Sequence, residues 1–212
     1  MKSVVRSLCS IATVLGVLTL SSATSYAQDH AKKNVKPRYD VSVSAMGQFG
    51  TNTDGNGVHQ TETYTGGALA SFRQSYKPWL GYQVDYAYHL SADRFNRNNY
   101  VQHDTHEATV SYLYKTRRVW DVEPFAYVGG GAVIFVPSNV SLPTQARGAG
   151  VYGAGVDYIP GALRKANPRL QAGIRLQYRG LTYRAPNFDD TALSTQSWRT
   201  TSEPAAGFFL RW

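Results

Sequence analysis

The sequence contains almost no cysteine and no long apolar run beyond its start. The single cysteine, Cys9, lies in the N-terminal apolar stretch, which excludes a disulfide within one chain. No segment after residue 28 repeats its apolar residues every 3.6 positions, and no run of 18 apolar residues occurs. Charged residues make up 17% of the chain, against about 25% in an average soluble domain. These absences exclude a disulfide-stapled fold, a helical bundle and a membrane-spanning helix.

The N-terminus has the pattern of a secretory signal peptide. Lys2 and Arg6 precede an apolar run over residues 8–20, and small residues lead to Ser25-Tyr26-Ala27. The sequence therefore predicts a cleaved signal over 1–27, a short periplasmic segment over 28–37 and one domain over 38–212. The net charge is +8. Because export argues against a nucleic-acid partner, we expect anionic lipid head groups to be the counterpart of this charge.

Alternation with a period of two, the pattern of strands with two different faces, recurs after the signal. We count eight such segments, at 39–49, 64–76, 80–90, 107–115, 125–135, 152–158, 170–179 and 203–212. The connections near 77–78, 116–123 and 160–168 are short, whereas those at 50–63, 91–103, 137–147 and 180–198 are longer and polar. An even number of strands with short and long ends predicts an eight-stranded antiparallel up-and-down β-barrel.

The polar faces of these strands do not have the composition of a solvent-exposed protein surface. They are rich in Gly, Ser, Ala and Thr, and their charges are isolated and balanced, five against five. Small side chains and paired charges suit the narrow interior of an eight-stranded barrel. Five of the predicted lumen charges fall toward the short-turn end: Asp40, Arg73, Lys115, Asp157 and Arg211. The other five fall nearer the middle and the loop end: Asp85, Glu107, Arg175, Arg179 and Glu203.

Aromatic residues collect at the predicted strand ends. Trp79, Trp120 and Trp212 lie at the short-turn end, and Tyr100, Tyr183 and Trp198 lie near the long loops. Amphipathic rings at both interfaces are typical of a membrane barrel. The fifth segment is apolar on both faces, and we assign Val128, Ala132, Ile134 and Val136 to its interior face.

The C-terminus carries the clearest family pattern. Ala206, Phe208, Leu210 and Trp212 occupy alternate positions, and Trp212 is the last residue. With this ending and the segments IRLQYRGLTY (174–183) and GVDY (155–158), the chain resembles the small bacterial outer-membrane β-barrels of the OmpA/OmpX-like class. The resemblance implies a monomeric transmembrane barrel in the outer membrane. It also implies that the four alternating residues are the signal recognised by the barrel-assembly machinery.

Two clusters resemble metal sites and fail on spacing. His103 and Glu107 would share one face of a strand but lie ~13 Å apart, and the motif is not the HExxH of a zinc site. Residues 52–57 begin like a calcium loop, but the position of the closing glutamate is occupied by Thr63. We therefore predict no metal, no cofactor and no catalytic residue.

These patterns favour a structural or interaction barrel with extracellular loops and at most a narrow pore. The partners expected are outer-membrane lipids and lipopolysaccharide, with the candidate phosphate contacts Arg94, Arg97, Arg184 and Arg199. Three alternatives remain open. They are an OmpW-like channel for small hydrophobic molecules, a lipid A-modifying enzyme with His106 as its base, and a soluble periplasmic ligand-binding barrel.

Overall fold

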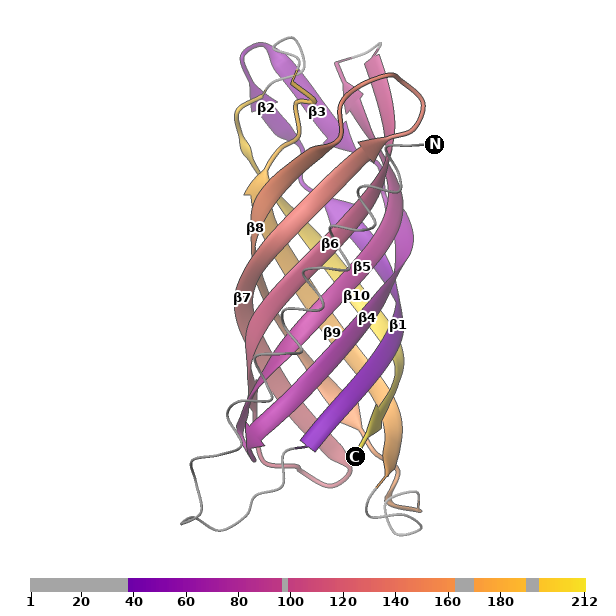
Figure 1. Ribbon diagram of the computed structural model, residues 1–212, viewed down its shortest axis with the longest axis vertical. Helices are drawn as coiled ribbons and strands as arrows, with labels where there is room; N and C mark the ends of the chain where they lie inside the picture. The colour runs from indigo at the N-terminus through magenta and orange to yellow at the C-terminus, as the bar shows by residue number, and fades with distance from the viewer. Residues whose placement is uncertain (1–37, 97–98, 163–169, 190–194) are drawn as a thin grey trace. The chain divides into compact units, whose positions relative to one another are not determined.

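Eight long strands close into a barrel in the computed structural model, which describes residues 38–96, 99–162, 170–189 and 195–212 (Figure 1). The barrel strands are β1 (Arg38–Gly50), β4 (Thr65–Lys77), β5 (Leu80–Phe95), β6 (Asn99–Lys115), β7 (Val122–Pro137), β8 (Gln145–Tyr158), β9 (Gln171–Arg184) and β10 (Trp198–Arg211). Each pairs antiparallel with the next, and β10 pairs with β1 to close the ring. The predicted eight-stranded barrel is confirmed; the predicted segments 1–27 and 28–37 lie outside the described residues.

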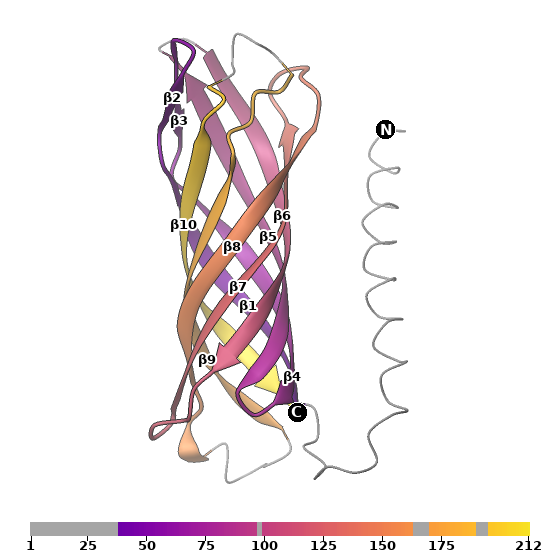
Figure 2. The ribbon, with the colours of Figure 1, turned by 90° about the vertical axis from the view of Figure 1, so that its left-hand side faces the viewer.

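The strands run obliquely around the barrel, as both side views show (Figure 1, Figure 2). Only two residues connect β4 to β5 at this end, residues 116–121 connect β6 to β7, and β8 ends at Tyr158 before β9 begins at Gln171. The opposite end carries the connections 51–64, 96–98, 138–144 and 185–197. We call these ends the turn end and the loop end. In bacterial barrels the shorter turns face the periplasm. Among the described residues, no helix is long and apolar enough to cross a membrane.

The loop end contains more strand than the sequence pattern predicts. The segment 91–103 was predicted as a loop, but β5 continues to Phe95 and β6 begins at Asn99. The segment 50–63 contains a hairpin of β2 (Thr53–Gly55) and β3 (Val58–Glu62), and β3 pairs with the end of β5. Asn56 and Gly57 have φ of 51° and 74°, the left-handed values of a tight hairpin turn. Both faces carry polar residues here, and the inward face also contains apolar ones such as Phe95 and Val101, so alternation gives little contrast.

The polarity of the barrel is inverted relative to a soluble protein. Large apolar side chains face outward, with 67% of Val43, 71% of Tyr112 and 74% of Phe208 exposed. The largest fully buried side chains include four arginines: Arg73, Arg175, Arg179 and Arg199. An apolar exterior is stable only against lipid, and a closed sheet leaves no backbone edge unpaired there. This polarity excludes the soluble periplasmic barrel.

The interior face of β7 is the reverse of our assignment. Val128 was assigned to the interior and is 62% exposed on the outer wall; Ala132, Ile134 and Val136 share its parity. The buried face consists of Phe125, Tyr127, Val133 and Phe135. The pattern could not decide because both faces are apolar. The register decides, since Val133 pairs with Glu107, an inward residue of β6.

Candidate functional site

The lumen is crossed by ion pairs at three levels, which we call the turn-end, middle and loop-end clusters. All ten charges assigned to the interior from the sequence lie there and are buried. The structure adds Glu62, Asp93, Glu123, His103 and Arg199, which the sequence analysis did not assign to the lumen. The predicted strands were too short at their ends. With longer strands, the alternation of inward and outward positions would have assigned most of these residues to the lumen.

The turn-end cluster is centred on Asp157 of β8. Arg175 donates from Nε to Asp157 Oδ1 at 2.7 Å and from Nη2 to Oδ2 at 3.0 Å. Arg211 donates to Oδ2 at 2.8 Å, and Arg73 reaches the same oxygen at 3.5 Å. Arg73 comes from β4, four strands around the barrel from β8. Asp157 therefore ties opposite walls of the lumen together.

Asp40 on β1 is the second carboxylate of the turn-end cluster. It accepts from Arg175 Nη2 at 2.9 Å and lies 3.5 Å from Lys115 Nζ. Arg175 was grouped with the middle of the barrel from the sequence, but it belongs here. The register explains the difference, because Arg175 is the cross-strand partner of Asp157 on β8 and therefore lies at the level of that carboxylate.

The middle cluster is organised by Arg179. Its Nη1 donates to Glu107 Oε2 at 2.5 Å and to Glu203 Oε2 at 2.7 Å. Glu107 lies on β6, three strands away from β9 around the ring. Asp85 accepts from Gln83 Nε2 at 2.8 and 2.7 Å. One guanidinium thus holds two carboxylates from opposite sides of the lumen.

The loop-end cluster contains a candidate residue that the structure relocates. Arg199 was predicted to contact lipopolysaccharide, but it is fully buried, with Nη1 2.8 Å from Asp93 Oδ1 and 3.8 Å from Glu62 Oε2. It has the inward parity of Glu203, four residues along β10. His103 Nε2 lies 3.2 Å from Asp93 Oδ2. This cluster fastens the β2–β3 hairpin to the barrel through Glu62.

The other candidate phosphate contacts have different positions. Arg94 and Arg184 are exposed at the loop end of β5 and β9. Arg97 lies outside the described residues. The two exposed arginines are therefore available to outer-leaflet head groups, whereas Arg199 is not.

The loop end is covered by the first residues of the 185–197 connection. Gln145 Oε1 accepts from the backbone N–H groups of Asn187 at 2.9 Å and Phe188 at 3.1 Å. The Phe188 ring is buried, with its centroid 6.4 Å from that of Phe95 and 5.9 Å from that of His103. Gln60 Nε2 on the hairpin donates to the backbone oxygen of Pro186 at 3.3 Å. These contacts join separate loops into one cap.

The histidine-rich segment does not form a metal site. His103 and Glu107 face the lumen at different levels, and no group of three His, Cys, Asp or Glu residues in the described ranges can hold a metal ion. His106 faces outward and shares a hydrogen bond of 2.8 Å between Nδ1 and the Tyr86 hydroxyl. Its cross-strand partners are Tyr88 and Ile134. Neither partner supplies the nucleophile that a deacylase base requires.

A row of polar side chains on the hairpin resembles an acid–base–hydroxyl arrangement. Asp54 and His59 Nδ1 are hydrogen-bonded, and His59 Nε2 lies 3.2 Å from Thr61 Oγ1. The side chains of His59 and Asp54 are 53% and 74% exposed. Water competes for hydrogen bonds at such exposure, so the row has the character of a cross-strand surface contact.

The C-terminal residues lie on the outer wall and run from mid-height to the turn end. Ala206, Phe208, Leu210 and Trp212 are exposed and share one face of β10. The Trp212 ring stacks on Tyr39 with centroids 6.2 Å apart, and the backbone groups of these two residues exchange hydrogen bonds of 3.0 and 2.9 Å. The final residue therefore completes the seam between β10 and β1.

The fold has known counterparts, although no protein-family model and no curated protein sequence matches this chain. The outer membrane protein OprG from Pseudomonas aeruginosa superposes with a TM-score of 0.54 at 12% identity, over 82% of this chain and 95% of OprG. Neisserial surface protein A superposes with a TM-score of 0.54 at 13% identity, over 81% of this chain and 95% of that protein. At such identities the likeness shows the fold alone. With that fold and an apolar exterior, this chain is an integral β-barrel protein of the bacterial outer membrane.

Proposed function

We propose that this protein is a non-catalytic outer-membrane barrel with a closed lumen, whose interactions take place at its covered loop end. The observation that carries the proposal is the set of buried ion pairs between opposite walls. Arg73–Asp157 and Arg179–Glu107 each join strands on different sides of the ring, and all four residues are at most 1% exposed. Side chains therefore occupy the axis along which ions would pass.

The loop end supports the second half of the proposal. Hydrogen bonds join the hairpin, the 185–189 segment and β8, because Gln60 donates to Pro186 and Gln145 accepts from the backbone of Asn187 and Phe188. A loop surface that is already ordered loses little entropy when it binds a partner. Outer-leaflet lipids and the barrel-assembly machinery remain the proposed partners within the membrane, with a monomer as the proposed state.

The test is the single-channel conductance of the refolded barrel in a planar bilayer. We expect no discrete current steps from a preparation shown to be folded by its heat-modifiable migration in gels. Glu203→Ala leaves one of the two carboxylates on Arg179, so the pair Arg179–Glu107 still closes the middle level and the variant should also be silent. Protein-free vesicles fused to the same bilayer serve as the control and should give no current steps. Discrete current steps from the wild-type barrel alone would refute the closed lumen.

A hydrophobic-molecule channel is the second candidate, and one observation favours it. Phe95, Val101, Phe135 and Phe188 are buried together near the loop end in a larger apolar cluster. Such a cluster could receive a small apolar molecule if Phe188 moved outward. Uptake of a fluorescent apolar dye into vesicles distinguishes the two proposals, because the closed barrel should add nothing to the rate of protein-free vesicles. Uptake by the wild-type barrel that exceeds the protein-free rate, and that Phe188→Ala increases further, would favour the channel.

A further inference from the structure

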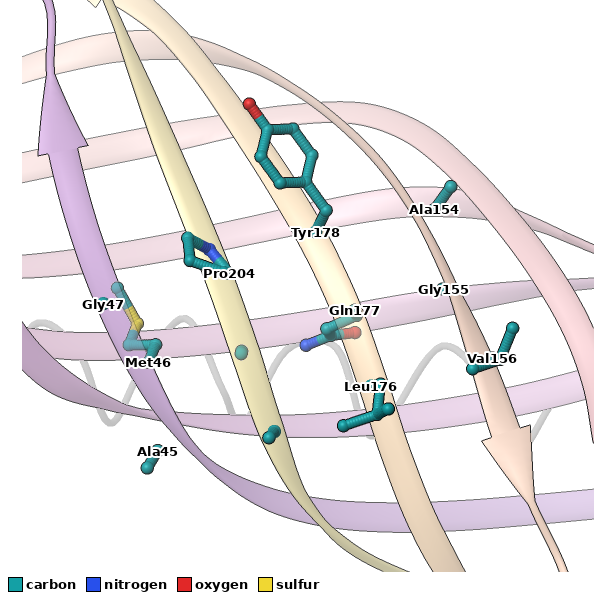
Figure 3. A pocket seen from close by; sticks show the side chains of 12 residues that line it. Ala45, Met46, Gly47, Ala154, Gly155, Val156, Leu176, Gln177, Tyr178 and Pro204 are labelled. Carbon is teal, nitrogen blue, oxygen red and sulfur yellow. The ribbon is translucent and has the colours of Figure 1, made fainter.

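The outer wall of the barrel has a shallow depression at mid-height, with a volume of about 670 Å³. Its outward-facing lining comes from four neighbouring strands, β1, β10, β9 and β8. Figure 3 shows Leu176 and Tyr178 on β9 between Pro204 on β10 and Ala154 on β8. Ala45, Gly47, Val156 and Ala206 complete the outward lining. We call this depression the wall groove.

The groove exists because the side chains on β1 and β10 are short where the ladder between them is interrupted. Register pairs run to Met46↔Ala205 and resume only at Phe49↔Ser202. Pro204 lies in the gap, and proline has no N–H to donate to a neighbouring strand. Opposite this gap stands Gly47, which has no side chain to fill the space.

The groove lies near the middle of the bilayer. Trp198 and Trp212 are exposed at the two ends of β10, and Pro204 is six residues from the first and eight from the second. Six strand residues span ~20 Å along the strand, or ~15 Å along the bilayer normal at a tilt of ~40°. That is about half of the ~30 Å hydrocarbon core. The groove is therefore at the depth where an outer-leaflet acyl chain ends.

A polar track runs along the same wall from the groove to the loop end. The Tyr178 hydroxyl and Ser202 Oγ are 2.7 Å apart, and Thr182 Oγ1 and Thr200 Oγ1 are 3.1 Å apart. Beyond them, exposed Arg184 pairs in register with Trp198. Since tryptophan marks the interface, the guanidinium lies at the level of lipid phosphates.

We propose that this wall binds one molecule of the phosphorylated, multiply acylated glycolipid of the outer leaflet. Arg184 binds a phosphate, the Thr182–Thr200 hydroxyl pair contacts the polar backbone of the lipid, and the end of one acyl chain lies in the wall groove. Charge complementarity selects this occupant, because a cation at head-group depth lies on β9, the strand that also lines the apolar groove at chain depth. The inference requires only that the barrel spans the outer membrane, so it does not depend on whether the lumen conducts.

The test uses the full barrel refolded in phosphatidylcholine nanodiscs that contain a small fraction of bisphosphorylated lipid A. Native mass spectrometry measures how much lipid A stays on the barrel after removal from the disc. We expect Arg184→Gln to weaken retention about tenfold, the effect of one charge-assisted hydrogen bond. Arg94→Gln removes the other described exposed arginine of the candidate set, on β5, which does not line the groove, and should weaken retention much less.

The groove is tested separately by Ala45→Phe, which fills it, against Ala126→Phe on the outer face of β7. Only the first should reduce retention, and dephosphorylated lipid A should lose its dependence on Arg184 while keeping its dependence on Ala45. Gel migration checks that each variant is folded, and Ala45→Leu replaces Ala45→Phe if that variant fails. Equal effects of Arg184→Gln and Arg94→Gln would overturn the proposal. So would barrel–barrel cross-links through the groove, which would identify a second copy as its occupant.

Discussion

Replacing Arg179 by methionine tests the buried charge network most directly. Its Nη1 is 2.5 Å from Glu107 Oε2 and 2.7 Å from Glu203 Oε2, and all three residues are buried. Methionine keeps much of the volume and removes the charge, so two carboxylates are left facing each other. Removing one partner of a buried ion pair costs about 3–5 kcal/mol. We expect the variant to lose about that much stability.

Urea unfolding in lipid vesicles, followed by tryptophan fluorescence, measures this loss. The chain contains four tryptophans, and each lies at an end of the barrel where unfolding changes its environment. A loss of about 4 kcal/mol with a slope of about 2 kcal/mol per molar urea lowers the midpoint by about 2 M. Arg94→Met is the matched control, because this exposed arginine makes no lumen contact and should shift the midpoint little.

A second variant separates charge from packing. Arg179→Met combined with Glu107→Gln and Glu203→Gln no longer leaves two carboxylates facing each other, and Asp85 keeps its hydrogen bonds from Gln83, so this variant should recover most of the lost stability. The reasoning fails if Arg179→Met unfolds within 1 kcal/mol of the wild type, as judged by about 0.5 M in midpoint. It also fails if the triple variant is no more stable than the single one, which would mean that shape and not charge is decisive.

Three further predictions concern packing, the cap and assembly. Gly131→Ala should lower the urea midpoint by the equivalent of about 1–3 kcal/mol, because the new Cβ would lie 2.0 Å from the Ala108 oxygen, whereas Gly148→Ala, with nothing within 4 Å, should not. Gln145→Ala should speed proteolysis of the 185–197 connection in vesicles without shifting the midpoint much, because it removes the acceptor of two backbone hydrogen bonds; unchanged cleavage would mean that the cap does not depend on it. Trp212→Ala should lower the amount of barrel in cell outer membranes while Trp198→Ala does not, and equal amounts would contradict the assembly role of the last residue.

Alternation identified all eight barrel strands because one wall of the barrel meets lipid and the other meets charge. Over residues 39–45 of β1 and 172–179 of β9 the outward positions are apolar or small and the inward ones are small or polar, so the pattern was sufficient there. In β7 it was not. With both faces apolar, only the pairing of Val133 with Glu107 determines which side is inside, and that pairing is a three-dimensional fact.

The strand ends were hidden for a different reason. Above the lipid band the outer face meets water, so Arg94 and Gln102 are as polar as the inward Asp93 and His103. Residues with such a uniform pattern look like loop. One local signal was available, since Asn56-Gly57 between short runs predicts a hairpin, and it would have led to β2 and β3.

Neither the alternation of the strands nor the balance of their charges predicts which charged residues pair within the lumen. The sequence supplies the sign and the parity of each charge, but a guanidinium spans several residues of strand height and reaches across the ring. Arg73 and Asp157 are 84 positions apart and come from opposite walls. Their contact depends on the stagger of the closed barrel. Balanced charge was therefore predictable as a class, whereas the three levels and the place of Arg175 were not.

The three levels also bear on why the loop end is ordered. The loop-end cluster holds Glu62 of the hairpin against Arg199 of β10, and Gln60 joins the same hairpin to Pro186. The network of ion pairs that fills the membrane-spanning lumen thus continues into the β2–β3 hairpin at the loop end. Because that segment is fixed before any partner arrives, a partner's binding energy is not used to order it. A change in the loop-end cluster, far from any exposed side chain, should therefore weaken binding at the surface as much as a change in the surface itself.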